Sequence, residues 1–100
     1  MELKPIYKDD MIEVVGRVEG DRFFVHAKLF EKSRFSAFKH YLNLMSVIEN
    51  EAHERGFSDI YTTVSSRDQA RWTQFLGFEY NNEIWESGGK TYEIMKLRAA

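Results

Sequence analysis

Two apolar runs between Met11 and Phe30 have the two-residue period of β-strands. Gly20 lies between two acidic residues at the point where the runs separate, a pattern typical of a hairpin turn. In the second run, alternate residues point to opposite sides of the predicted sheet. One face is expected to carry Phe23, Val25, Ala27 and Leu29, and the other Phe24, His26, Lys28 and Phe30. The beginning of the chain therefore predicts an antiparallel hairpin.

The period changes to that of an α-helix from about Arg34 to Arg55. Apolar residues recur there at i, i+3 and i+4 spacing and form one apolar stripe: Phe38, Tyr41, Leu42, Met45, Ile48 and Ala52. Gly56 follows, where a left-handed residue commonly ends a helix. The compact run Ile60 to Val64 is rich in β-formers. A long helix between two strands predicts a β-α-β crossover with parallel strands.

A short second helix is predicted after Ser66. Ser66 to Gln69 fits a capping box, in which the serine hydroxyl accepts from the N–H of Gln69 and the glutamine side chain reaches back. Gly77 ends this helix. One of its faces is expected to carry three apolar side chains: Trp72, Phe75 and Leu76.

Two further strands, Phe78 to Trp85 and Thr91 to Leu97, flank a turn rich in glycine. Met1 to Asp10 is interpreted as a short lead-in with at most a marginal strand. The expected order is β-β-α-β-α-β-β, which gives an α+β fold with a mixed sheet. Residues 1–100 are expected to form a single domain, in keeping with the length of the chain.

Three features together resemble the GNAT N-acetyltransferases. They are the hairpin that leads into the long helix, the strand Asp59 to Val64 with its capped short helix, and the closing run Arg71 to Phe78. The resemblance covers about Phe23 to Leu97. It implies a GNAT-like (acyl-CoA N-acyltransferase-like) fold, shortened at its beginning. It further implies acetyl-CoA as cofactor and transfer of its acetyl group to an amine.

The start of the long helix departs from the family pattern. The family holds the CoA pyrophosphate on backbone N–H groups of a glycine-containing turn. Here the corresponding stretch, Lys32 to Lys39, contains no glycine, and either Phe35 or Lys39 stands where the backbone must approach phosphate closely. The resemblance assigns cofactor binding to Lys32, Arg34, Ser36, Ala37 and Lys39, and to Ser66 at the cap of the short helix. The alternative is a solvated, basic helix start.

His26 is the candidate catalytic residue. In a GNAT-like fold its strand lines the acetyl-transfer cleft, where a neutral imidazole can take a proton from an amine. The alternative is a half-exposed strand histidine without a catalytic role. Thr73 stands where many family members carry a tyrosine acid, and a threonine hydroxyl is a poor acid. His40 and His53 show no metal-ligand spacing, so no metal is expected.

Composition narrows the function classes. The net charge is −2, whereas nucleic-acid binders normally show a basic excess, so no nucleic acid is expected. Cysteine is absent, which excludes disulfides and thiolate chemistry. Neither a signal-peptide pattern nor a membrane-length apolar run occurs, so a cytoplasmic location is expected. Asp9 and Asp10 are interpreted as exposed charge.

A second hypothesis is a catalytically inactive GNAT-fold module that binds a protein. The runs Phe38 to Leu42 and Gln69 to Trp72 resemble tailed-phage proteins similar to the internal virion protein A of T7-like phages. That resemblance would place the chain in a virion or in a host cytoplasm.

Exposed apolar surface is expected because the predicted sheet has few helices to cover it. A homodimer or a protein partner is therefore expected, on Phe24, Phe30 and the C-terminal hairpin. The aromatic residues near that hairpin form either an interface or core: Trp72, Tyr80, Trp85 and Tyr92.

Overall fold

The computed structural model describes residues 4–10, 12–29 and 34–98, and side chains in 5–10, 12–28 and 39–98. The elements are β1 (Lys4–Lys8), β2 (Ile12–Glu19), β3 (Arg22–Leu29), α1 (Arg34–Glu54), β4 (Asp59–Val64), α2 (Arg67–Phe75), β5 (Glu79–Ser87) and β6 (Lys90–Arg98). The expected order is confirmed from β2 onward. The lead-in is more than marginal, because β1 pairs with β2 along its length.

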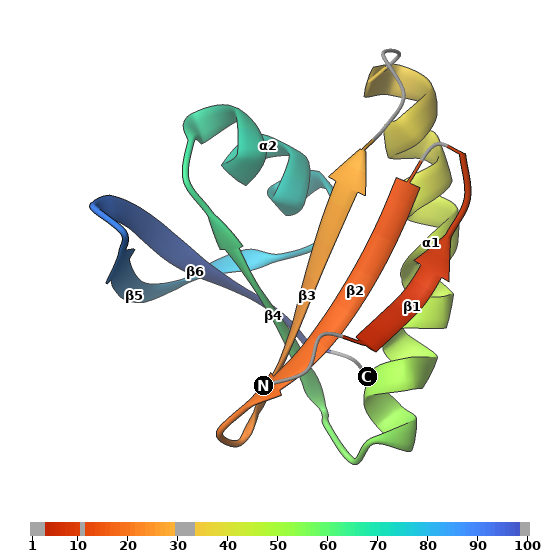
Figure 1. Ribbon diagram of the computed structural model, residues 1–100, viewed down its shortest axis with the longest axis horizontal. Coiled ribbons are helices and arrows are strands. Elements are labelled where there is room, and N and C mark those ends of the chain that lie inside the picture. The colour runs from red at the N-terminus through yellow and green to blue at the C-terminus, as the bar shows by residue number, and fades with distance from the viewer. Residues whose placement is uncertain (1–3, 11, 30–33, 99–100) are drawn as a thin grey trace.

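One six-stranded mixed sheet, in the order β1-β2-β3-β4-β6-β5, forms the centre of the molecule. The pair β3–β4 is parallel, and the other four neighbouring pairs are antiparallel. The predicted crossover is therefore confirmed, with α1 joining the two parallel strands. Figure 1 shows α1 running along the β1–β3 part of the sheet, while α2 lies above the space between β3 and β4.

The main core lies where α1 packs on the sheet. Its side chains come from every part of the chain: Ile12, Val14, Phe23, Val25, Leu44, Ile48, Ala52, Ile60, Val64, Ala70, Phe78 and Met95. The predicted apolar stripe is only partly correct. Leu42 is 42% exposed, and Leu44 takes its place in the core. Because Leu44, Ile48 and Ala52 are spaced by four, they follow one side of the helix more closely than the predicted set.

Both helices end in the same backbone motif. Gly56 and Gly77 adopt positive φ angles of 84° and 104°, as the residue after the helix requires. The following phenylalanine then donates its N–H to a carbonyl of the last turn, from Phe57 to Ala52 at 2.9 Å and from Phe78 to Thr73 at 3.2 Å. The two predicted glycine stops are therefore confirmed.

The predicted capping box at α2 is half correct. Ser66 Oγ accepts from the N–H of Gln69 at 3.2 Å, as expected. The side chain of Gln69 reaches past Ser66, and its Oε1 accepts from the N–H of Ser65 at 2.8 Å. The predicted apolar face of α2 is wrong at Phe75, which is 79% exposed. Ala70 is the buried residue of this helix, and the predicted Leu76, at the C-cap, packs against the core.

On the second face of the sheet, the C-terminal hairpin, whose strands form one edge of the same sheet, contacts β3. The ring of Phe24 lies 5.1 Å from the ring of Trp85 and 5.6 Å from that of Tyr61, measured between centroids. Phe24 is fully buried, so the prediction that it belongs to a partner surface is wrong. Phe30 lies outside the described residues. The hairpin does expose Ile84 and Tyr80, so a partner on the hairpin stays a prediction.

Asp9 is not the exposed charge that the sequence suggested. Its Oδ2 accepts from Tyr7 Oη at 2.7 Å and lies 2.5 Å from Nε2 of His40. Its Oδ1 accepts from the N–H of Ile12 at 2.9 Å. The carboxylate therefore joins the β1–β2 connection to α1, and His40 has a structural contact.

Candidate functional site

The parallel strands β3 and β4 separate soon after they begin. Their register pairs are Phe23 with Ile60 and Phe24 with Tyr61, at the start of each strand. Beyond these pairs the strands diverge toward their carboxyl ends, as Figure 1 shows. Where they part, Thr62 Oγ1 donates to the carbonyl oxygen of Val25 at 2.8 Å. Further along, the two strands have no ladder bonds to each other among the described residues.

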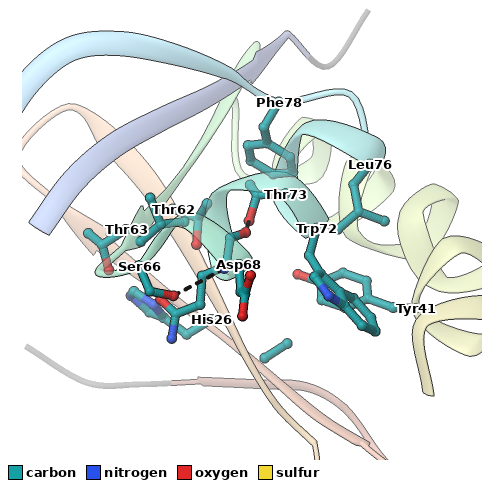
Figure 2. A pocket seen from close by; sticks show the side chains of 13 residues that line it. His26, Tyr41, Thr62, Thr63, Ser66, Asp68, Trp72, Thr73, Leu76 and Phe78 are labelled. Carbon is teal, nitrogen blue, oxygen red and sulfur yellow. Dashed lines mark hydrogen bonds between the residues drawn. The ribbon is translucent and has the colours of Figure 1, made fainter. Parts of the chain in front are cut away.

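A cleft of about 490 Å³ occupies this divergence and continues between α1 and α2. Figure 2 shows His26 and Thr63 at one end and Tyr41 with Trp72 at the other. Its lining comes from β3, α1, β4 and α2 and from the connections on either side of α2: His26, Ala27, Tyr41, Thr62, Thr63, Val64, Ser66, Asp68, Gln69, Trp72, Thr73, Leu76 and Phe78. The lining includes both polar and apolar side chains, which suits a ligand that is itself partly polar.

His26 is half-buried at the cleft end where the strands part. Burial lowers the pKa of its imidazole below the ordinary value of 6.5, and the nearby positive charge of Arg17 lowers it further. Glu19 acts in the opposite direction. The imidazole is consequently neutral at pH 7 and has a free lone pair, as a general base requires.

The hydroxyl of Thr73 lies in the cleft wall, but its proton is already engaged in a hydrogen bond. Thr73 Oγ1 donates to the backbone carbonyl of Gln69 at 2.7 Å.

Tyr41 also lines the cleft, although the sequence placed it only in the apolar stripe of the long helix. Burial raises the pKa of Tyr41 to about 12. Its phenol is therefore neutral at pH 7. The position of Tyr41 in the cleft depends on how α1 lies relative to α2, which the sequence pattern does not indicate.

A second cavity, of about 690 Å³, meets the cleft at His26 and Thr63, which line both. Its other lining residues come from β2, β5 and β6: Arg17, Glu19, Ile84, Trp85, Glu86, Ser87 and Tyr92. His26 and Thr63 therefore lie at the boundary between the cleft and the second cavity. The sequence did not reveal this cavity, because its walls are brought together by the folding of the C-terminal hairpin over β2 and β3.

The predicted cofactor residues are not gathered in one place by the described part of the structure. Ser66 lines the cleft and caps α2. Arg34, Ser36 and Ala37 belong to the first two turns of α1, where no acidic residue occurs in the first turn. Lys39 is exposed and lines neither the cleft nor the second cavity. Lys32 lies outside the described residues.

The described residues form neither a metal-ligand cluster nor a membrane-spanning helix. Nowhere in this part of the chain do three histidine, aspartate or glutamate side chains gather as metal ligands. No helix in the same part is long and apolar enough to cross a membrane.

No protein-family model and no curated protein matches the chain. Solved structures do match. A protein of Lactobacillus plantarum assigned as an N-acetyltransferase is 14% identical, with a TM-score of 0.70 over 90% of this chain and 61% of that one. The ribosomal-protein-S18-alanine N-acetyltransferase of Escherichia coli is 16% identical, with a TM-score of 0.60 over 90% and 62%. The anti-CRISPR protein AcrVA5 is 14% identical, with a TM-score of 0.61 over 91% and 94%.

These similarities establish the fold. The chain has the GNAT, or acyl-CoA N-acyltransferase-like, fold that the sequence predicted. It spans less than two thirds of the length of the two acetyltransferases named above. None of the three structures is an internal virion protein, so the predicted likeness to that group of phage proteins stays a prediction.

Proposed function

We propose that this protein binds acetyl-CoA in the cleft between β3 and β4 and transfers the acetyl group to an amine. The observation that carries the proposal is the position of His26. A neutral imidazole lies where the cleft opens into a second cavity, so a donor in one space and an acceptor in the other would meet beside it. Such positioning of two reactants beside a base is a large part of catalysis by proximity.

The cleft fits the central arm of the cofactor. Because β3 and β4 diverge, the backbone groups that face each other beyond the Thr62–Val25 hydrogen bond are available to another strand-like partner. An extended chain with amide groups satisfies that need. Trp72, Leu76 and Phe78 would provide apolar contact along it. In this proposal the start of α1 holds the phosphate end, with Arg34, Ser36, Ala37 and Lys39 in its first two turns, and the role of Lys32 stays a prediction.

Bound acetyl-CoA would supply a thioester carbonyl, whose carbon forms a C–N bond with the amine as the C–S bond breaks. The amine must lose a proton in this exchange. His26 is the group assigned to take it, since burial keeps the imidazole neutral at pH 7. Thr63 lines both spaces beside it and is placed to orient the acceptor nitrogen.

No acid for the departing thiolate is assigned to the cleft hydroxyls. The hydroxyl of Thr73 already donates its proton in a hydrogen bond to the backbone carbonyl of Gln69. Tyr41 has a pKa of about 12, well above that of a thiol near 8.5, so proton donation to the thiolate is unfavourable. The proposed rate enhancement therefore comes from positioning and from the base.

The test is release of the CoA thiol from acetyl-CoA in the presence of an amine. We expect His26→Gln to lower kcat/KM about 100-fold or more, the usual scale for loss of a general base. His53→Gln, at the exposed end of α1, is the matched control and should leave kcat/KM unchanged. Absence of amine-dependent thiol release from the unchanged protein, over a broad amine panel, would refute the proposal.

A further inference from the structure

The segment that follows β1 lies beside the first half of α1, as Figure 1 shows, and Asp9 is fixed within it. The N–H of Asp9 donates to the carbonyl of Ile12 at 2.9 Å, and the N–H of Ile12 donates to Asp9 Oδ1 at 2.9 Å. Ile12 is fully buried in the core. The carboxylate of Asp9 is therefore anchored to the sheet, while its second oxygen, Oδ2, meets α1.

This second oxygen holds His40. Nε2 of the imidazole lies 2.5 Å from Asp9 Oδ2, and because a carboxylate can only accept, Nε2 carries a proton and donates the hydrogen bond. Tyr7 donates its hydroxyl to the same oxygen at 2.7 Å. The Tyr7 ring also meets the imidazole edge-on, with centroids 5.6 Å apart and an interplanar angle of 68°. Two residues of the first segment therefore hold one side chain of α1.

The contact lies ahead of the buried packing of α1. Buried side chains begin at Leu44 in the described part of this helix. Before it, Leu42 is exposed and Tyr41 is half-buried. His40 lies about one turn closer to the beginning of the helix than Leu44. Its hydrogen bond to Asp9 therefore fixes α1 at a point that the buried packing does not reach.

The same contact sets how α1 faces the cleft. Tyr41 follows His40 directly and lines the cleft. Because successive residues of a helix point about 100° apart, the rotation that turns His40 toward Asp9 also turns Tyr41 toward the cleft. Arg34, where α1 begins, lies about 9 Å along the helix axis from His40. A tilt or rotation of the helix at His40 would therefore move both Tyr41 and the beginning of α1.

We infer that Asp9 is a positioning residue for the cofactor, which fixes the beginning of α1 relative to the cleft through its hydrogen bond to His40. This role rests on the proposed function, because it requires that α1 bind the phosphate end of acetyl-CoA while the thioester lies beside His26. A ligand that is held at two ends binds well only when both ends are correctly placed, and a displacement of about 1 Å is costly. Asp9 lines neither the cleft nor the second cavity, so it acts through His40 and not by contact.

His40→Leu tests this role, because it removes the hydrogen-bond donor and keeps an apolar side chain in its place. The Kd for acetyl-CoA, measured by calorimetry, should rise about tenfold. In the thiol-release assay, KM for acetyl-CoA should rise while kcat stays unchanged, because the end of the cleft at His26 is left intact. S-Acetylpantetheine has the same thioester and arm but no phosphates, so its kcat/KM should change less than about twofold.

Two further substitutions separate the hydrogen bond from the side chain that makes it. His40→Gln supplies an amide N–H that can donate to Asp9, so it should recover most of the lost affinity for acetyl-CoA. His53→Leu makes the same change as His40→Leu at the exposed end of α1, and it should leave the Kd unchanged.

Asp9→Asn approaches the contact from the other side. It leaves one acceptor oxygen for three donors, which are the N–H of Ile12, the hydroxyl of Tyr7 and Nε2 of His40. Its Kd for acetyl-CoA should rise as in His40→Leu, and it makes the same comparison with S-acetylpantetheine if His40→Leu does not fold. The double variant should bind no more weakly than His40→Leu alone, because both changes remove one contact.

The role of Asp9 and the proposed function fail separately. If the unchanged protein binds acetyl-CoA and His40→Leu binds it as tightly, only the role of Asp9 is overturned. Equal losses with acetyl-CoA and S-acetylpantetheine would also overturn it, because they would indicate a general loosening of the fold. If the unchanged protein neither binds acetyl-CoA nor releases its thiol, the proposed function fails, and the role of Asp9 fails with it.

Discussion

Phe24 on β3 and Trp85 on β5 are 61 residues apart in the sequence, and their ring centroids lie 5.1 Å apart at an interplanar angle of 41°. This contact brings the C-terminal hairpin across the second face of the sheet. It buries Phe24 completely and places Trp85 at the edge of the second cavity. One aromatic pair therefore contributes both to the fold and to the proposed acceptor site.

Removal of the buried ring should be costly. Phe24→Ala is expected to lower the free energy of unfolding by about 3 kcal/mol or more, because it deletes a fully buried aromatic side chain. Phe75→Ala removes the same group at a position that is 79% exposed, and should cost less than about 1 kcal/mol. Urea denaturation measures both. Equal costs would show that Phe24 is not packed as described.

The lowered pKa of His26 predicts a pH dependence of stability. Below pH 6.5 the unfolded chain protonates this imidazole before the folded protein does, so protons favour unfolding. The free energy of unfolding should fall as pH decreases from 6.5 toward the folded pKa. His26→Gln should remove this component, whereas His53→Gln should retain it. Chemical denaturation over a pH series measures the difference, and identical curves for all three proteins would contradict the assignment.

Ser66 has a cap role that can be separated from any cofactor role. Ser66→Ala removes the acceptor for the N–H of Gln69 and should cost about 1 kcal/mol of stability. Ser66→Asp keeps the cap and should restore the stability, but it adds a negative charge to the cleft. If Ser66 lies near bound phosphate, acetyl-CoA affinity should fall more in the aspartate variant than in the alanine variant. The reverse order would show that Ser66 is only a cap.

Gly16 on β2 has no room for a side chain. A Cβ there would lie 2.8 Å from Phe23 Cζ and 3.0 Å from Ile6 Cδ1. Gly16→Ala should therefore destabilise the protein by about 1–3 kcal/mol through overpacking. The double variant with Phe23→Leu should cost less than the sum of the two single variants, because the shorter side chain relieves the contact. Strict additivity in thermal or urea unfolding would contradict this contact.

Local chemistry made most of the fold predictable. The strand and helix periods, the glycine stops at Gly56 and Gly77, and the Ser66 cap all act within a few residues. Tertiary packing decided the remainder. In α1, Leu44 is buried where the sequence predicted Leu42. In α2, Ala70 is buried and Phe75 is exposed. Which side chains of a helix are buried depends on how the helix packs on the sheet, and residue spacing alone does not determine this.

Of the positions that the sequence linked to a site, His26, Ser66 and Thr73 line the cleft, while their roles stay predictions. Tyr41 packs against the core, as its spacing in the apolar stripe predicted, but the same residue also lines the cleft, and its spacing did not indicate that. The second cavity has walls from β2, β3, β4, β5 and β6, and no local pattern links Arg17 to Trp85. The cofactor residues before and at the start of α1 stay predictions, because no geometric finding at that end of the cleft tests them.

The central claim is that acetyl-CoA binds between the diverging strands. The most direct measurement is a titration of ¹⁵N-labelled protein with acetyl-CoA, followed by the backbone amide signals. The account predicts saturable shifts concentrated in residues 26–28 and 62–64 and at the cleft-facing side of α2. Absence of shifts at millimolar acetyl-CoA, or shifts confined to other parts of the sheet, would contradict it.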